Sequence, residues 1–313
     1  MKPGLRFALA VILFIGLFPC IAQETTVPPP ARTTVAVEEP KSVDIRGEQL
    51  HYIEQGEGEP LIFIHGTVGD YRAWISRMEP YGEDYHVVAY SRRYAYPNQA
   101  VFDESADYSV RIHADDLYAL IKELGLGKVH LVGHSYGAYT ALTMALDHPE
   151  VVRSMVLGEP PAAPLLDHSE AGKASWDQFM EESLRPAAQA FREDKDEEGV
   201  ELFLKGVLED DFSLDATPPE VKQAWMDNLS ELWGAAMTES FIPLAPEKIQ
   251  KLDVPVLLLV GERSPTWLVE ISNELHRLLP QSELVRFDNI SHGLYFEDPE
   301  AVDEAMHDFL EGK

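Results

Sequence analysis

Cysteine is nearly absent from this chain of 313 residues, since its one cysteine, Cys20, lies in an apolar N-terminal stretch. Once that stretch is removed, the remaining chain holds no thiol. Disulfide bonds, cysteine-based zinc sites and a cysteine nucleophile are then excluded. The protein must be held together by core packing, and a chain of this length with 45% hydrophobic residues can form a large core.

Basic residues are scarce as well. The chain has 25 lysines and arginines against 54 aspartates and glutamates, which gives a net charge of −29. Nucleic-acid binding needs a cationic surface, so this charge argues against it, and it disfavours anionic membrane surfaces and anionic substrates for the same reason. We interpret the acidity as a solubility feature.

Motifs for cofactors are missing too. The sequence shows no cluster of metal ligands, no dinucleotide-binding glycine pattern and no P-loop. We therefore expect neither a metal nor a cofactor, and any chemistry must come from the side chains themselves.

The N-terminus has the features of a signal peptide. Lys2 and Arg6 precede an apolar run over residues 7–18, which is too short to cross a bilayer but fits a signal-peptide core. Residues 1–22 are predicted to be cleaved before Gln23. The protein is then exported, periplasmic or secreted, with no stable membrane insertion afterwards.

Two alternatives to cleavage stay open: a retained membrane anchor through residues 7–19, and lipid modification of Cys20. Pro19 just before it is unusual for a lipoprotein signal. Residues 23–42 are rich in proline and threonine and have no apolar periodicity, so they are predicted to be a linker.

The chain is organised around Gly133-His-Ser-Tyr-Gly137, which fits Gly-x-Ser-x-Gly. A short apolar run over residues 129–132 precedes it, and a helical pattern that ends at Pro149 follows it. Such a strand–turn–helix presents the serine on a strained turn, and side chains at the two glycines would block the approach of strand to helix. Ser135 is predicted to be a nucleophile.

Apolar strand patterns alternate with helical ones through most of the chain, which predicts a mostly parallel sheet covered by helices on both faces. A hairpin over residues 43–53 is predicted at the sheet edge. The further predicted strands cover residues 61–64, 86–90, 129–132, 151–157, 254–260 and 282–287.

The alternation stops between residues 162 and 251, where no strand pattern occurs. Amphipathic helices are predicted at 175–191, 197–208 and 219–233, and we interpret them as a helical cap inserted into the core. One or two of their aromatic residues should line a pocket beneath it. The domain prediction is thus core at 43–161, cap at 162–251 and core again at 252–313.

Several short motifs occur in a particular order along the chain. They are His65-Gly66, Gly133–Gly137, Pro149 after the next helix, Gly261-Glu-Arg-Ser-Pro265 and Ser291-His292-Gly293. In order and spacing they resemble the α/β-hydrolase fold family, in its capped, esterase- or lipase-like subgroup, over residues 43–313. The resemblance implies about eight mostly parallel strands and a Ser–His–acid hydrolase.

A serine hydroxyl needs a base to become a nucleophile, and histidine is the natural base near neutral pH. His292 is predicted to be that base, because the resemblance places its loop over the serine turn. His65 is expected to shape the neighbouring loop. The oxyanion hole is predicted from two backbone N–H groups, that of Tyr136 after the nucleophile and, by the resemblance, that of Thr67.

The acid that orients the histidine departs from the family's commonest pattern, in which an aspartate stands three residues after the glycine that ends strand seven. Counted from Gly261, that position holds Ser264. Some relatives carry the acid just after strand six, which here is Glu159. We predict Glu159 as the acid, with Glu262 as the alternative.

Two arginines follow the strand at residues 86–90, at the carboxyl-end face of the sheet where ligands bind. Arg92 or Arg93 is expected to bridge to Asp70 or to a cap acid and to fix loop geometry. Binding of a substrate carboxylate is the alternative.

These features together predict an exported serine hydrolase that cleaves a small carboxylic ester or lactone through an acyl-enzyme on Ser135. The same triad could instead hydrolyse a carbon–carbon bond or act as a cofactor-free haloperoxidase or perhydrolase. A third alternative is a receptor-like binding protein with slow turnover.

Overall fold

The computed structural model describes residues 39–98, 102–208 and 212–313. The predicted signal peptide and nearly all of the predicted linker lie outside these residues. The described residues belong to one compact unit, Glu38–Lys313. None of the helices in the described part of the chain has the length and apolar character needed to cross a membrane.

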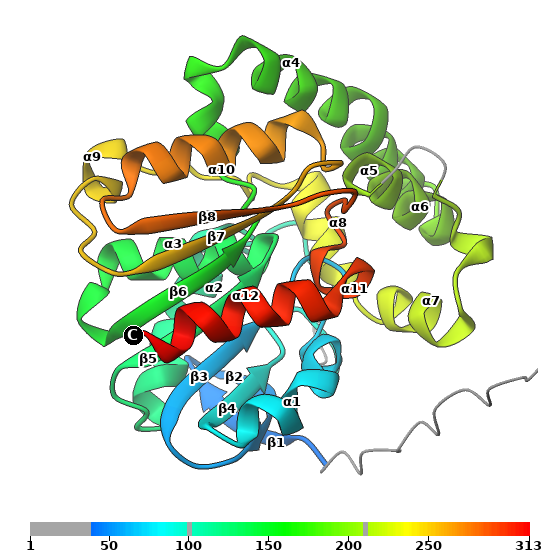
Figure 1. The fold of residues 1–313 in the computed structure, drawn as a ribbon. Coiled ribbons are helices and arrows are strands. Elements are labelled where there is room, and N and C mark those ends of the chain that lie inside the picture. The colour runs from blue at the N-terminus through cyan, green and yellow to red at the C-terminus, as the bar shows by residue number, and fades with distance from the viewer. Residues whose placement is uncertain (1–38, 99–101, 209–211) are drawn as a thin grey trace, which may run out of the picture. The chain divides into compact units, whose positions relative to one another are not determined.

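The centre of the fold is an eight-stranded sheet with the order β1-β2-β4-β3-β5-β6-β7-β8 (Figure 1). β1 and β2 form the predicted edge hairpin, and β2 also pairs antiparallel with β4. The neighbours from β4 to β8 all pair in parallel. The predicted fold class is confirmed. The strands are β1 (Lys41–Ile45), β2 (Glu48–Gln55), β3 (Glu59–Ile64), β4 (Tyr85–Tyr90), β5 (Val129–His134), β6 (Val152–Gly158), β7 (Val256–Gly261) and β8 (Ser282–Phe287).

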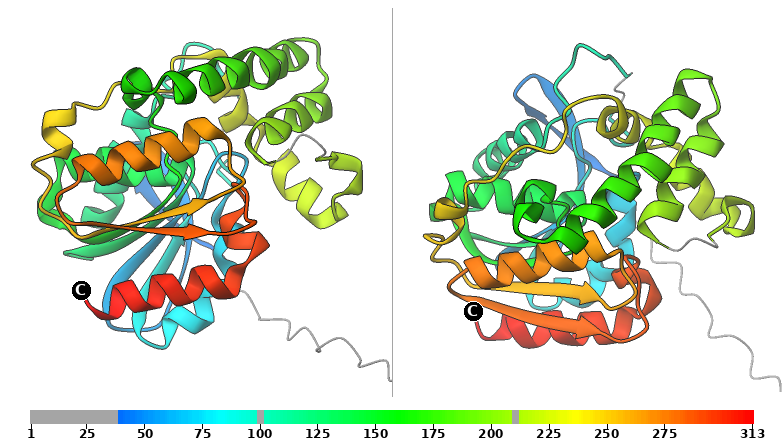
Figure 2. Two further views of the ribbon diagram at one scale, coloured as in Figure 1. Left: turned by 45° about the horizontal axis from the view of Figure 1, so that its top comes forward. Right: turned by 90° about the horizontal axis from the view of Figure 1, so that it is seen from above.

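Helices cover both faces of this sheet, as Figures 1 and 2 show. Alternate residues of a strand point to opposite faces, so Leu61 and Phe63 of β3 lie in one apolar cluster and Ile62 and Ile64 in the other. The first cluster packs against α1 (Ile75–Gly82), α11 (Leu294–Glu297) and α12 (Pro299–Glu311). The second packs against α2 (Val110–Glu123), α3 (Tyr136–Asp147) and α10 (Thr266–Leu278).

Between β6 and β7 the chain is helical, and no strand occurs in the described residues from 162 to 251. We keep the name cap for residues 162–251, whose separation from the core as a domain stays a prediction. Trp176 of the cap packs against Trp267 of α10, with ring centroids 5.0 Å apart. The cap helices are α4 (Glu170–Phe179), α5 (Arg185–Arg192), α6 (Asp196–Val207), α7 (Pro219–Met226), α8 (Leu229–Met237) and α9 (Pro246–Ile249).

Several predicted boundaries differ from the structure by one or more residues. The helix predicted at 175–191 begins earlier and contains a π-helical turn at Met180–Leu184. The helix predicted at 219–233 is two helices, because Asn228 between them directs its side chain to Asp70 and to the backbone N–H of Tyr96. β1 begins at Lys41, which the sequence had placed in the linker.

Candidate active site

The turn around Ser135 connects β5 to α3 and is sharply strained. Ser135 has φ 52° and ψ −122°, a region that residues with a side chain rarely adopt. A Cβ added at Gly133 would lie 2.6 Å from the backbone nitrogen of Ala138, and one added at Gly137 would overlap the carbonyl of Ile64. The two glycines therefore allow α3 to pack directly against β3 and β5.

Glu159 and His292 are in direct contact and both are buried. His292 Nδ1 lies 2.5 Å from Glu159 Oε2, while Glu159 Oε1 accepts a hydrogen bond from Gly261 N–H at 2.8 Å. Glu159 directly follows β6, and the last residue of that strand, Gly158, accepts a hydrogen bond from Ser135 N–H at 2.7 Å. The carboxylate is thus anchored on the strand beside the serine turn.

The alternative acid is in a different environment. Glu262 is exposed, and the structure brings Glu159, not Glu262, to His292. Ser264, at the position of the usual aspartate, is buried, and its hydroxyl has no partner among the described residues.

Ser135 and His292 line the same cavity of about 540 Å³. No hydrogen bond joins Ser135 Oγ to His292 in residues 39–98, 102–208 and 212–313, and such bonds often form only in the substrate complex. His134 supports His292 from behind, since its Nε2 lies 2.8 Å from the His292 carbonyl oxygen. Burial lowers the pKa of His134 to about 3, so its ring is neutral and donates to that carbonyl.

The two predicted oxyanion donors flank the serine. A Cβ added at Gly66 would lie 3.1 Å from Ser135 Cβ, so the Gly66–Thr67 segment runs beside the nucleophile. The N–H of Thr67 donates to no group in the described part of the chain. The N–H of Tyr136 opens α3, where helix N–H groups have no partner within the helix.

His65 holds this loop in place, as predicted. Its Nε2 accepts a hydrogen bond from Arg92 N–H at 2.9 Å, and its Nδ1 lies 2.8 Å from the Gly66 carbonyl oxygen. Burial and the Arg92 charge hold the pKa of His65 well below its usual range. The ring is therefore neutral, and its one proton is on Nδ1.

Both arginines after β4 form buried ion pairs. Arg92 contacts a cap acid, Glu231, with Nη2 2.5 Å from Oε2. Arg93 contacts Asp116 on α2 through two hydrogen bonds of 2.7 and 2.6 Å. The expected bridge to a cap acid is therefore present, while Asp70 pairs with Arg72 instead.

Sequence reasoning did not identify Glu231 or Arg72. The predicted helix at 219–233 has several acidic residues, and no local pattern distinguishes the one that is buried from the others.

The cavity is largely apolar. Two aromatic residues of the cap, Phe203 and Trp225, line it, as the sequence led us to expect. Its other apolar side chains come mainly from α6 and α7, and they include Val68, Leu204, Val207, Leu208, Val221, Ala224 and Phe296. In the described residues, no cluster of His, Cys, Asp and Glu could hold a metal ion.

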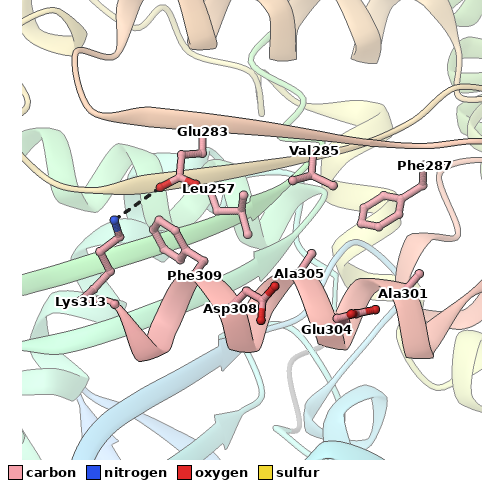
Figure 3. A pocket seen from close by; sticks show the side chains of 11 residues that line it. Leu257, Glu283, Val285, Phe287, Ala301, Glu304, Ala305, Asp308, Phe309 and Lys313 are labelled. Atoms are coloured by element: carbon pink, nitrogen blue, oxygen red, sulfur yellow. Dashed lines mark hydrogen bonds and ion pairs between the residues drawn. The ribbon is translucent and has the colours of Figure 1, made fainter.

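A second cavity, of about 380 Å³, lies between β8 and α12 (Figure 3). Val285, Phe287 and Phe309 form its apolar part, and Lys313 pairs with Glu283 at its end. It contains none of the predicted site residues.

Comparison with known proteins agrees with this fold. The family model described as alpha/beta hydrolase fold matches residues 59–299. The (E)-2-((N-methylformamido)methylene)succinate hydrolase of Acinetobacter baylyi is 23% identical over 267 residues, which cover 83% of this chain and 94% of that protein. The 2-hydroxy-6-oxo-6-(2'-aminophenyl)hexa-2,4-dienoic acid hydrolase of Metapseudomonas resinovorans is 26% identical over 286 residues, 86% and 89% of the two chains.

Among solved structures, a thermophilic esterase from Thermogutta terrifontis matches with a TM-score of 0.69 and 23% identity, over 88% of this chain and 98% of that one. At this identity the likeness shows the fold alone. Because the family model covers most of its length, this chain belongs to the alpha/beta hydrolase fold family.

Proposed function

We propose that this protein is a serine hydrolase that cleaves a neutral, apolar carboxylic ester or lactone through an acyl-enzyme on Ser135. The observation that carries the proposal is the buried Glu159–His292 pair, whose histidine lines the same cavity as Ser135 on its strained turn. A base that is held by a carboxylate and lines one cavity with a serine is the arrangement that can activate a serine hydroxyl.

The chemical steps follow from these positions. Glu159 holds the Nδ1 proton of His292, which leaves Nε2 free to take the proton of Ser135 Oγ. The oxygen attacks the ester carbonyl, and the N–H groups of Thr67 and Tyr136 stabilise the oxyanion. His292 then gives its proton to the leaving alcohol. Water, deprotonated by the same histidine, releases the acid and restores the serine.

Charge in the cavity favours a neutral substrate. Arg72 is the one lysine or arginine among the described lining residues, and it is already engaged. Its Nη2 donates to Asp70 at 2.7 Å and to Asp227 at 2.9 Å. Glu220 and Glu297 also line the cavity, so a substrate carboxylate would meet more negative than positive charge.

Carbon–carbon bond hydrolysis is the second candidate, because the relative from Metapseudomonas resinovorans is named for a dienoic acid substrate. That name implies an anionic substrate, as does the succinate in the name of the Acinetobacter baylyi relative. In the cavity of this chain the few charged lining residues include more carboxylates than cations, which favours the neutral ester over both.

The test compares wild-type protein with Ser135→Ala on three substrates: p-nitrophenyl butyrate, a 2-hydroxy-6-oxo-dienoate, and acetate with hydrogen peroxide. The proposal expects ester hydrolysis by the wild type, its loss in the variant, and slower turnover of the anionic dienoate. Faster dienoate turnover would assign carbon–carbon hydrolysis instead. Binding without turnover of any of the three would assign a receptor-like role.

Export belongs to the same proposal. The mature protein should begin at Gln23, which N-terminal sequencing of the protein from its native host can establish. An intact Met1 would indicate a retained anchor, and an acylated Cys20 would indicate a lipoprotein.

A further inference from the structure

We propose that Arg92 and Glu231 are positioning residues for the oxyanion hole, so that α8 of the cap takes part in catalysis without touching the substrate. The inference rests on the proposed function, because an oxyanion hole has meaning only for that chemistry. Neither residue is among those that line the substrate cavity.

Arg92 acts on the peptide unit that carries the Thr67 N–H. Its Nη2 donates to the Gly66 carbonyl oxygen at 3.1 Å, and its Nε donates to the His65 carbonyl oxygen at 3.2 Å. The Gly66 carbonyl and the Thr67 N–H belong to one planar peptide unit and point in opposite directions. Fixing the carbonyl therefore fixes the direction of the N–H.

Two other donors reach the same Gly66 carbonyl oxygen: His65 Nδ1 at 2.8 Å and Gly69 N–H at 3.2 Å. Both are neutral, whereas the Arg92 guanidinium carries a full charge. A charged donor on the carbonyl polarises the peptide and makes its N–H a stronger donor to a developing oxyanion. Arg92 is thus the one of the three that adds charge stabilisation as well as orientation.

Arg92 also contacts the residue that supplies the second donor. Its guanidinium carbon lies 5.0 Å from the centroid of the Tyr136 ring, and the Tyr136 hydroxyl lies within hydrogen-bond distance of the carbonyl oxygens of Tyr108 and Ser240, at 3.1 and 2.9 Å. The Tyr136 side chain is therefore held at both ends. One guanidinium thus contacts both the Gly66–Thr67 peptide and the ring of Tyr136.

Glu231 fixes the position of the Arg92 guanidinium. The side chains of Arg92 and Glu231 are 1% and 3% exposed, and a charge buried to this degree depends on its partner. Glu231 Oε1 has no hydrogen-bond partner among the described residues, so the carboxylate interacts with Arg92 through Oε2 alone. Asn228, just before α8, donates to Asp70 at 2.7 Å and ties the same helix to the loop after β3.

The competing explanation is an ordinary ion pair that only docks the cap on the core. The chain offers a control in the next residue, Arg93, whose pair with Asp116 is also buried, although it is made through two hydrogen bonds rather than one. That pair contacts α2 and not the Gly66–Thr67 peptide. Asp116→Asn removes a buried charge of the same kind next to the site without disturbing the oxyanion donors.

The experiment uses the full mature protein at pH 8, with p-nitrophenyl butyrate as substrate and an alkylboronic acid as inhibitor. A boronate forms a tetrahedral adduct on the serine and places an oxygen in the oxyanion hole. For each of Arg92→Met, Arg92→Lys, Glu231→Gln and Asp116→Asn, we would measure kcat per serine titrated with a fluorophosphonate, KM, and the boronate inhibition constant.

Losing an oxyanion donor lowers kcat by 10²- to 10³-fold, so loosening one in Arg92→Met should lower it by roughly 10- to 100-fold. The boronate constant should rise in parallel, and KM should stay within about twofold. Glu231→Gln should lose less, roughly 3- to 10-fold, because its amide oxygen still accepts from Arg92. Arg92→Lys should restore part of what Arg92→Met loses. Asp116→Asn should lower the melting temperature with kcat and the boronate constant unchanged.

Equal kcat and boronate constants in wild type, Arg92→Met and Glu231→Gln would overturn the inference, and so would an equal loss in Asp116→Asn. If Arg92→Met does not fold, Arg92→Lys and Glu231→Gln still decide the matter. A wild type without serine-dependent ester hydrolysis overturns the proposed function itself, which distinguishes that failure from one of the positioning pair.

Discussion

Replacing Glu159 by glutamine tests the acid of the proposed triad with a change of one atom. The native carboxylate accepts twice, from Gly261 N–H at 2.8 Å and from His292 Nδ1 at 2.5 Å. A glutamine amide has one acceptor and one donor side. If its oxygen faces Gly261, its NH₂ faces Nδ1 and forces the imidazole proton onto Nε2, which then cannot accept the Ser135 proton. If the amide is reversed, two donors face each other at Gly261.

The expected loss is large. In a Ser–His–Asp triad the corresponding amide substitution lowers kcat by roughly 10⁴-fold, or about 5 kcal/mol in activation free energy. The measurement is kcat on p-nitrophenyl butyrate, with circular dichroism to verify the fold. Glu262→Gln is the control and should stay within twofold of the wild type, since Glu262 is exposed. A loss below tenfold in Glu159→Gln, or an equal loss in Glu262→Gln, would refute the assignment.

Three further predictions concern the acid position, the cavity and the buried cap acid. Adding Ser264→Asp to Glu159→Gln should recover at least tenfold in kcat, because Ser264 is buried, has an unpartnered hydroxyl and stands at the family's usual acid position. No recovery would mean that a carboxylate at this position does not reach His292. Val207→Trp should narrow the apolar cavity and shift the preferred p-nitrophenyl ester to a shorter acyl chain, whereas an unchanged chain-length profile would place the acyl group elsewhere. Burial raises the pKa of Glu231 from 4.5 to about 7, with Asp70 adding to the rise and Arg92 opposing it. Between about pH 4.5 and 7 the folded state therefore keeps a proton on Glu231 that the unfolded state releases. The free energy of unfolding is highest below about pH 4.5 and falls by about 3 kcal/mol as the pH rises through 7. Glutamine does not titrate, so urea unfolding should show the free energy of unfolding of Glu231→Gln rising relative to that of the wild type between pH 5 and pH 8. A difference between the two proteins that is the same at both pH values would contradict this pKa.

Much of the fold and of the candidate site could be predicted from the sequence because the signals are local. Strand and helix periods indicate a covered parallel sheet, and the glycines around Ser135 mark a turn that no larger residue could form. Glu159 could be predicted as the acid because the motifs resemble a family in which some members carry the acid just after strand six. These features depend on residues a few positions apart.

The remaining features depend on pairings between distant parts of the chain. Arg92 and Glu231 are 139 residues apart, and nothing near Glu231 shows that it is buried. The break between α7 and α8 follows from contacts of Asn228 with the loops after β3 and β4, which a helical period cannot reveal. The set of apolar side chains that line the cavity likewise depends on how α6 and α7 pack against the core, which the sequence does not reveal.

The most direct test of the central claim, that Ser135 is an activated nucleophile, is labelling with a fluorophosphonate followed by peptide mapping. We predict one label per wild-type molecule, located on Ser135, and no label and no ester hydrolysis in a folded Ser135→Ala variant. An unlabelled wild type, a label on another residue, or full activity in Ser135→Ala would contradict the account.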